Sequence, residues 1–135
     1  MRRLPPRTGA LLVEILMATA IFVLVTQIFF TLSEQKMRSI RIAEERTMAA
    51  IACDREIDGA RACSTEKLAG LDGSTFAVRG LPGRWEEAGR IEVGPVEGHP
   101  ELRKVVATVR WPAEGRGDEQ KVSLSGLVRA RGGNE

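Results

Sequence analysis

The stretch ALLVEILMATAIFVLVTQIFFTL, residues 10–32, decides the fold of this 135-residue chain. Its only charged residue is Glu14, and residues 15–33 carry no charge at all. A helix needs about 20 apolar residues to cross a hydrocarbon core about 30 Å thick, so the stretch predicts a transmembrane helix over residues 10–33. An ionisable group inside such a segment is costly and marks Glu14 as a candidate functional residue.

A short basic segment precedes the apolar stretch. Residues 1–9 carry three arginines and no acid, and they end in Gly9. On a helix, Glu14 lies about one turn from Ala10 on the same face. If the chain were cut before Ala10, the new α-ammonium would be a natural partner for the Glu14 carboxylate, within one subunit or between neighbours.

The run RTGALLVEILMATAIF, residues 7–22, resembles the leader and first helix of type IV pilin-like proteins. In that family an inner-membrane prepilin peptidase cuts after the Gly that ends a basic leader, and it usually N-methylates the new first residue. The resemblance implies that residues 1–9 are the leader and that cleavage falls between Gly9 and Ala10. It also implies N-methylation of Ala10 and a role in assembly for Glu14. Ala10 departs from the family pattern, in which Phe or Met is commoner at this position.

Two other interpretations of the apolar stretch stay open. A secretory signal peptide has an apolar core of only about 7–15 residues followed by a small-residue cut site. Here the small residues 18–20 lie in the middle of the run instead. An ordinary single-pass anchor would leave Glu14 to reach towards the membrane interface. Basic residues flank the span on both sides, so an orientation with the C-terminal part in the periplasm rests on the resemblance.

The charge balance argues against a nucleic-acid partner. The formal net charge is +2, but removing residues 1–9 lowers the 20 Lys and Arg to 17 against 18 Asp and Glu, a net charge of −1. A chain this close to neutral has no strong electrostatic attraction to a phosphate backbone. Three of the four Phe lie in the apolar stretch, so no base-stacking platform is apparent in the rest.

The helix is expected to continue beyond the membrane, over residues 34–61, because this segment has no Pro and a single Gly. Apolar and small residues at mostly helical spacing predict one packed face: Ile40, Ala43, Thr47, Ala50, Ile51 and Ile57. Charged residues predict the solvated face: Glu45, Arg46, Arg55 and Glu56.

From residue 62 the periodicity changes from helical to alternating, which predicts a small β-sheet head over residues 62–130 and a disordered tail at 131–135. Strands are expected at 75–79, 90–96, 102–111 and 122–128. In the third, Val105, Ala107, Val109 and Trp111 share one face. The predicted fold class is α+β, with a long N-terminal transmembrane helix followed by an antiparallel sheet of three to four strands, the pilin-like layout.

Cys53 and Cys63 form a candidate disulfide that would tie the end of the helix to the loop after it. A head of about 74 residues is small enough to profit from such a bridge, and the periplasm would permit it. The alternative is two unpaired thiols, because spacing along the sequence does not establish proximity.

Catalytic chemistry finds no support in the sequence. The only histidine, His99, is expected in a surface loop, and the acidic pairs Glu86–Glu87 and Asp118–Glu119 in solvated turns. Neither a nucleophile–base motif nor a phosphate-binding glycine loop occurs. We therefore expect a protein that is not an enzyme, with no cofactor, no bound metal and no small-molecule substrate.

The C-terminal stretch VVATVRWP, residues 105–112, followed by VSLSGL at 122–127, is similar to the end of the minor pseudopilin I of type II secretion and of V-type minor pilins. The resemblance implies a minor pseudopilin in the bacterial inner membrane, with partners in the prepilin peptidase, other minor and major pseudopilins and membrane lipid. A minor pilin of a type IV pilus is the alternative. A third interpretation, from a different class, is an anchored periplasmic binding domain that enters no filament.

Overall fold

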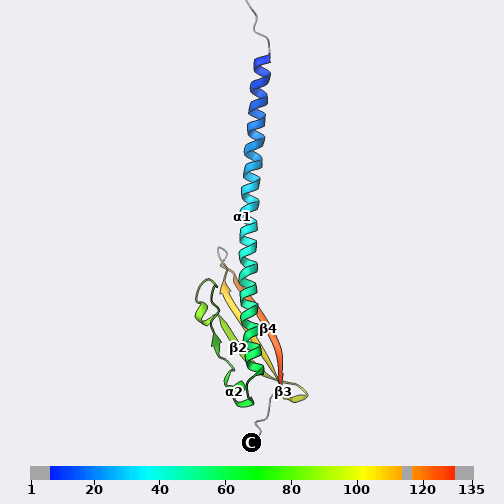
Figure 1. Cartoon of the computed structure of the whole chain (residues 1–135), viewed down its shortest axis with the longest axis vertical. Coiled ribbons are helices and arrows are strands. Elements are labelled where there is room, and N and C mark those ends of the chain that lie inside the picture. Colours follow the sequence, from blue (N-terminus) through cyan, green and yellow to red (C-terminus); the bar gives the residue numbers. More distant parts are fainter. Residues whose placement is uncertain (1–6, 114–116, 130–135) are drawn as a thin grey trace, which may run out of the picture. The chain divides into compact units, whose positions relative to one another are not determined.

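The computed structural model describes residues 7–113 and 117–129 of the chain. One long helix, α1 (Arg7–Arg61), is followed by a short helix, α2 (Thr65–Gly70), and by four strands (Figure 1). The strands are β1 (Thr75–Phe76), β2 (Gly89–Val96), β3 (His99–Pro112) and β4 (Glu119–Arg129), with a 3₁₀ turn, η1 (Trp85–Glu87), between β1 and β2. The predicted α+β, pilin-like layout of an apolar N-terminal helix and a small antiparallel sheet is confirmed.

The chain divides into two compact units between Arg41 and Ile42, and the boundary falls inside α1. The first unit is helical from Arg7 onward. The second unit combines the C-terminal part of α1 with the whole sheet. The head therefore begins at Ile42, because the end of the helix belongs to the same compact body as the strands.

The four strands form an antiparallel meander in the order β1-β2-β3-β4, so each strand pairs with its neighbour in sequence. The register pairs Ile91 with Ala107 and Val109 with Val122. Strand β1 is only two residues long, and residues 72–74, which precede it, also hydrogen-bond to the edge of β2. There Ile91 N–H donates to the Ser74 carbonyl at 2.9 Å, and Val93 N–H donates to Asp72 Oδ1 at 2.9 Å.

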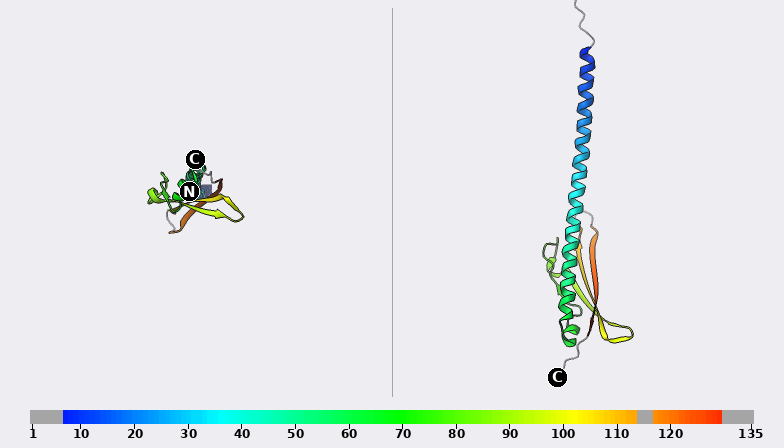
Figure 2. Two further views of the ribbon diagram at one scale, coloured as in Figure 1. Left: turned by 90° about the horizontal axis from the view of Figure 1, so that it is seen from below. Right: turned by 45° about the vertical axis from the view of Figure 1, so that its right-hand side comes forward.

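The C-terminal part of α1 lies alongside the sheet (Figure 2), and small residues on the helix make most of the contact. Ala49, Cys53, Ile57 and Ala60 are buried at spacings of three and four residues, which places them on one helical face. The sheet presents alternate residues of β3 to the core: Val105, Ala107, Val109 and Trp111. This alternation confirms the face predicted from the sequence.

Gly126 of β4 sets how closely the helix approaches the sheet. A Cβ atom at this position would lie 2.7 Å from Cγ2 of Ile57, closer than real Cβ atoms come to their neighbours. The absence of a side chain at Gly126 is therefore what lets Ile57 rest on the strand.

Two polar contacts also join the helix to the sheet. Trp111 Nε1–H donates to Glu45 Oε2 at 2.9 Å, and Arg46 Nη2 donates to Gln120 Oε1 at 3.0 Å. The contact at Glu45 is partly buried, so the prediction that this residue belongs to the solvated face is wrong. A buried indole N–H needs an acceptor, and Glu45 supplies it.

The predicted packed face of the helix is also partly wrong. Ile57 is buried as expected, but Ile51 is 64% exposed, and the buried positions are taken mainly by Ala and Cys. A helical face is predicted from the spacing of large apolar residues, to which Ala and Cys contribute little. A sheet that approaches the helix closely leaves room only for small side chains, so the buried face differs from the predicted one.

The predicted strands differ from the observed ones in their ends. The strand expected at 75–79 stops at Phe76, because Val78 N–H instead donates to the carbonyl of Trp85 in the η1 turn. His99, expected in a loop, is the first residue of β3. Helix α2, which the sequence pattern did not indicate, contributes the buried Leu68 to the core.

Cys53 and Cys63 are both free thiols. Unbroken helix separates Cys53 from Arg61, about 12 Å at 1.5 Å per residue, whereas a disulfide requires Cα atoms within about 7 Å. The structure thus contains two free thiols, of which Cys53 is buried and Cys63 is partly exposed. The predicted tail at 131–135 and residues 1–6 of the predicted leader lie outside the described residues.

Candidate assembly segment

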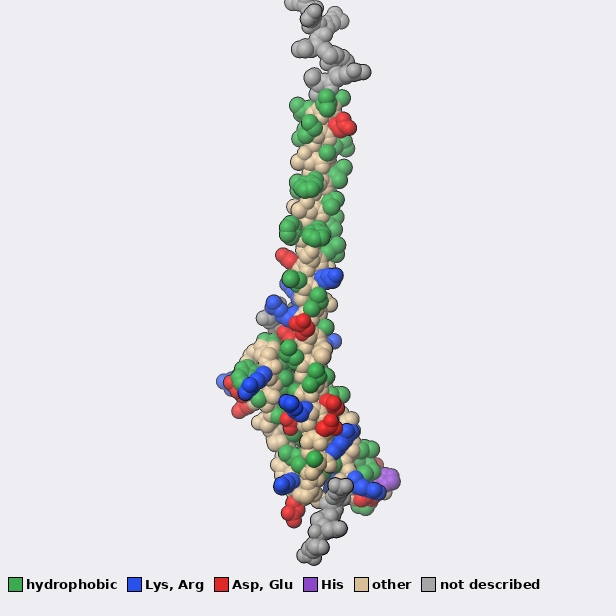
Figure 3. All heavy atoms as spheres, viewed as in Figure 1, with side chains coloured by type: hydrophobic (Ala, Val, Ile, Leu, Met, Phe, Trp, Pro, Cys, Tyr) green, Lys and Arg blue, Asp and Glu red, His purple; other side chains and the backbone are tan. Residues whose placement is uncertain are grey.

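The N-terminal half of α1, residues 9–33, exposes its large apolar side chains to solvent. Figure 3 shows them along the face of the helix turned towards the viewer. Its large apolar residues are between half and about two-thirds exposed, among them Leu16, Phe22 and Phe30. By length and composition, α1 is the one helix among the described residues that could cross a membrane. Within its own unit nothing covers this surface, which suits contact with lipid or with another protein.

Glu14 lies near the start of this apolar surface and is exposed. In the described part of the chain its carboxylate has no hydrogen-bond or ion-pair partner. Such a group in an apolar environment calls for a cation or a proton. Within these residues the fold does not supply a cation, so it would come from a free N-terminus or from another subunit.

Gly9 and Ala10 lie in the first turns of α1 and are both exposed. Gly9 has no positive φ, and a Cβ atom placed on it would meet nothing within 4 Å. Gly inside a helix is about 1 kcal/mol less favourable than Ala. The fold of this chain therefore gives no reason for glycine at position 9, and a requirement of another protein would explain it.

The polar residues of the apolar half fall into two kinds. The hydroxyls of Thr19, Thr26 and Thr31 donate to the backbone carbonyls four residues earlier, at 2.7, 2.8 and 2.9 Å. These hydroxyls are satisfied within the helix. The carboxamide of Gln27 is exposed and, among the described residues, has no partner. Gln27 was not among the predicted site residues, although an amide inside a 19-residue uncharged run is a signal for one.

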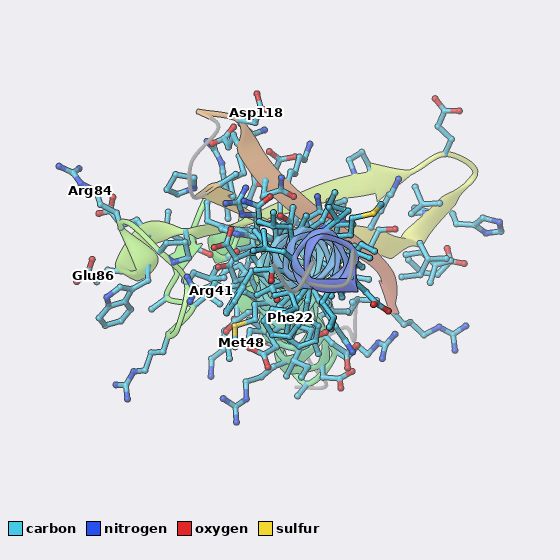
Figure 4. The ribbon with its side chains drawn as sticks, turned by 90° about the horizontal axis from the view of Figure 1, so that it is seen from above. Phe22, Arg41, Met48, Arg84, Glu86 and Asp118 are labelled. Atoms are coloured by element: carbon cyan, nitrogen blue, oxygen red, sulfur yellow. The ribbon has the colours of Figure 1, made fainter. Side chains whose placement is uncertain are left out.

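The histidine and the acidic pairs of the head lie apart from one another along the sequence and are largely exposed. His99 Nδ1 lies 3.6 Å from Glu101 Oε1, and both side chains are largely exposed. Arg84 and Glu86, beside and within the η1 turn, point into solvent (Figure 4). Within residues 9–113 and 117–129, no group of three or more His, Cys, Asp or Glu residues is placed to hold a metal ion.

The two thiols differ in environment. Burial raises the pKa of the Cys53 thiol to about 11, and its side chain is fully buried. Cys63, just past the helix, is partly exposed and lies 3.3 Å from the Gly59 carbonyl. Cys53 is thus an inert core residue, because a thiol must lose its proton and meet solvent in order to react.

No protein-family model, curated protein or solved structure matches this chain.

Proposed function

We propose that this chain is a minor pseudopilin of a type II secretion system, which helps to initiate or tip a short periplasmic filament. It would reside in the bacterial inner membrane as a single-pass protein with its head in the periplasm. The observation that carries the proposal is the placement of Gly9, Ala10 and Glu14 at the start of a helix whose apolar surface is left uncovered.

Three features of the chain support this proposal. The exposed apolar half of α1 suits storage in a bilayer followed by packing against other helices. Gly9 has no role in the fold, which fits recognition by a peptidase. The small four-stranded head has no large insertion, which suits a minor subunit of the I type better than the large capping subunit.

In this proposal Glu14 acts when the helix leaves the lipid and enters the filament. Cleavage after Gly9 creates an ammonium group on Ala10, and a neighbouring subunit's ammonium would neutralise the Glu14 carboxylate. A buried charge left without its partner costs about 3–5 kcal/mol, so a misplaced subunit would be disfavoured. The pair thereby gives the filament its register.

The first test is the intact mass and N-terminal peptide of the protein isolated from its native membrane. We expect a chain that starts at Ala10, with or without one methyl group. A chain that still starts at Met1 would contradict the processing step. Gly9→Val should block the cut, whereas Gly59→Val, at the other sterically open glycine of α1, should leave it unchanged.

The second test separates membrane residence from assembly. Glu14→Leu should remain in the membrane but fail to enter filaments, as measured by cross-linking to other subunits. Glu34→Leu, on the same helix beyond the apolar run, is the matched control. Incorporation of Glu14→Leu at the wild-type level would remove Glu14 from the mechanism.

The alternative assignment, a minor pilin of a type IV pilus, predicts the same processing and differs in phenotype. Loss of exoprotein secretion upon deletion would support the pseudopilin, and loss of surface pili would support the pilin. An anchored binding domain outside any filament would retain an uncut leader.

A further inference from the structure

We propose that Gln27 joins two copies of this chain side by side in the membrane, through a hydrogen bond between their carboxamides. The inference rests on the membrane-spanning helix of the proposed function and adds a partner for it, a second copy of this chain. It concerns a face of the helix distinct from the one that carries Glu14.

The starting observation is that Gln27 is the one amide in the uncharged run at 15–33 and has no partner among the described residues. It lies six residues from the end of this run, about 9 Å along the helix, and so inside the apolar layer. A carboxamide placed there without a hydrogen bond is unfavourable, because lipid tails offer neither donor nor acceptor. The nearby threonines are satisfied by their own backbone, whereas Gln27 is not.

A shallow groove on the helix leads to this residue. It is lined by Leu16, Thr19, Ala20, Val23, Leu24 and Gln27. Four of these, Leu16, Ala20, Val23 and Gln27, follow spacings of four, three and four residues, the pattern of a coiled-coil seam. Ala20 is a small residue of the kind that lets a second helix approach closely at this seam.

The occupant that fits this groove is the same groove of a second copy. Two copies inserted in one membrane in the same direction hold Gln27 at the same depth, so the two amides face each other. A carboxamide carries both donors and an acceptor, and each Gln27 can therefore donate to the other. A polar residue at one seam position is also a known means of fixing register and partner number in paired helices.

The arrangement leaves Glu14 free for its proposed role. At about 100° per residue, Glu14 lies about 140° around the helix from Gln27. The paired copies would thus still present their Glu14 faces to other subunits. Phe22 also lies about 140° away from Gln27. It is one of the side chains that extend outward from α1 when the molecule is seen from above (Figure 4).

The experiment measures energy transfer between copies of the full chain in phosphatidylcholine vesicles. Donor and acceptor dyes are attached to Cys63, because Cys53 is buried and does not react. The wild-type chain should show transfer that unlabelled chain competes away. Gln27→Leu should weaken the association about tenfold, whereas Gln27→Asn should retain most of it. Phe22→Leu, on the other face, should leave the association unchanged.

Wild-type transfer no greater than that of randomly mixed chains would overturn the proposal, because the partner would then not be a second copy. Equal transfer in Gln27→Leu and wild type would overturn it as well. So would an equal loss in Phe22→Leu and Gln27→Leu, since the contact would then not be specific to this face. None of these outcomes bears on the cut before Ala10, which the intact mass tests separately.

Discussion

The two halves of α1 use apolar residues in opposite ways. In the half that packs on the sheet, the buried positions are small: Ala49, Cys53 and Ala60, with Ile57 the only large one. In the N-terminal half, large residues such as Phe22, Phe29 and Phe30 are exposed. In the half that packs on the sheet, small side chains fill the narrow space that the close approach of the sheet leaves. The large side chains of the N-terminal half have no such partner within their own unit, and they suit contact with lipid or with other proteins.

The largest expected effect is at Trp111 of β3, the bulkiest residue of the core against which the C-terminal half of α1 packs. Trp111 is 2% exposed, so Trp111→Ala should lower the free energy of unfolding by about 4 kcal/mol through cavity formation. Denaturant unfolding of the full chain in detergent, followed by the fluorescence of Trp85, measures this change. Trp85→Ala, at a half-buried position and followed by Trp111 fluorescence, should cost clearly less. Equal losses would mean that the core is not centred on Trp111.

A smaller effect is expected where helix and sheet come closest. Gly126→Ala places a methyl group against Ile57 and should cost about 1–3 kcal/mol by overpacking. Gly94→Ala is the matched control, because a Cβ atom there meets nothing within 4 Å and no positive φ is involved. The same unfolding measurement should therefore show little change for Gly94→Ala. A neutral Gly126→Ala would mean that the helix can move away from β4 at no cost.

The hydrogen bond between Trp111 and Glu45 should contribute less to the free energy of unfolding. Glu45→Gln keeps an acceptor for the Trp111 N–H but removes its charge, so we expect a loss of about 1 kcal/mol. Glu44→Gln, the exposed neighbour, serves as the control and should change the free energy of unfolding by less than about 0.5 kcal/mol. If the unfolding curves of the two variants are the same, the charge of Glu45 does not contribute to the stability of the head.

The smallest effect on the free energy of unfolding is expected from a substitution in the N-terminal half of α1. Phe22→Ala shortens an exposed side chain that belongs to the first unit, so the free energy of unfolding of the head should change by less than about 0.5 kcal/mol. A loss comparable to that of Trp111→Ala would contradict the contrast between the two halves. Retention of Phe22→Ala in the membrane fraction shows that the variant still inserts.

The fold was largely predictable because its strongest patterns are long. The alternation Val105, Ala107, Val109 and Trp111 reports a half-buried strand directly, and the structure confirms it. The helical face against the sheet was not predictable in the same way. Its contacts are made by Ala and Cys, and their role depends on how closely Gly126 allows the two elements to approach.

For the candidate site, the sequence predicted three residues and the structure added their surroundings. Gly9, Ala10 and Glu14 come from the sequence, and the structure adds that they are exposed, that Glu14 is unpaired and that Gly9 has no steric purpose. For Gln27 the sequence offers the signal of an amide inside an uncharged run, and the structure adds a contrast. The three threonine hydroxyls of this run bond to their own backbone, whereas the Gln27 carboxamide has no partner among the described residues.

The meander order of the strands has a consequence for how the protein is made. Ile57 of α1 leaves the ribosome about 70 residues before Gly126, the position on which it comes to rest. The strand that completes this cover, β4, follows all the other described elements in the sequence and is synthesised after them. Until then the inner face of the helix has no cover from β4. The head can therefore mature only after β4 has emerged, by which time the apolar N-terminal half of α1 has long been available to a membrane.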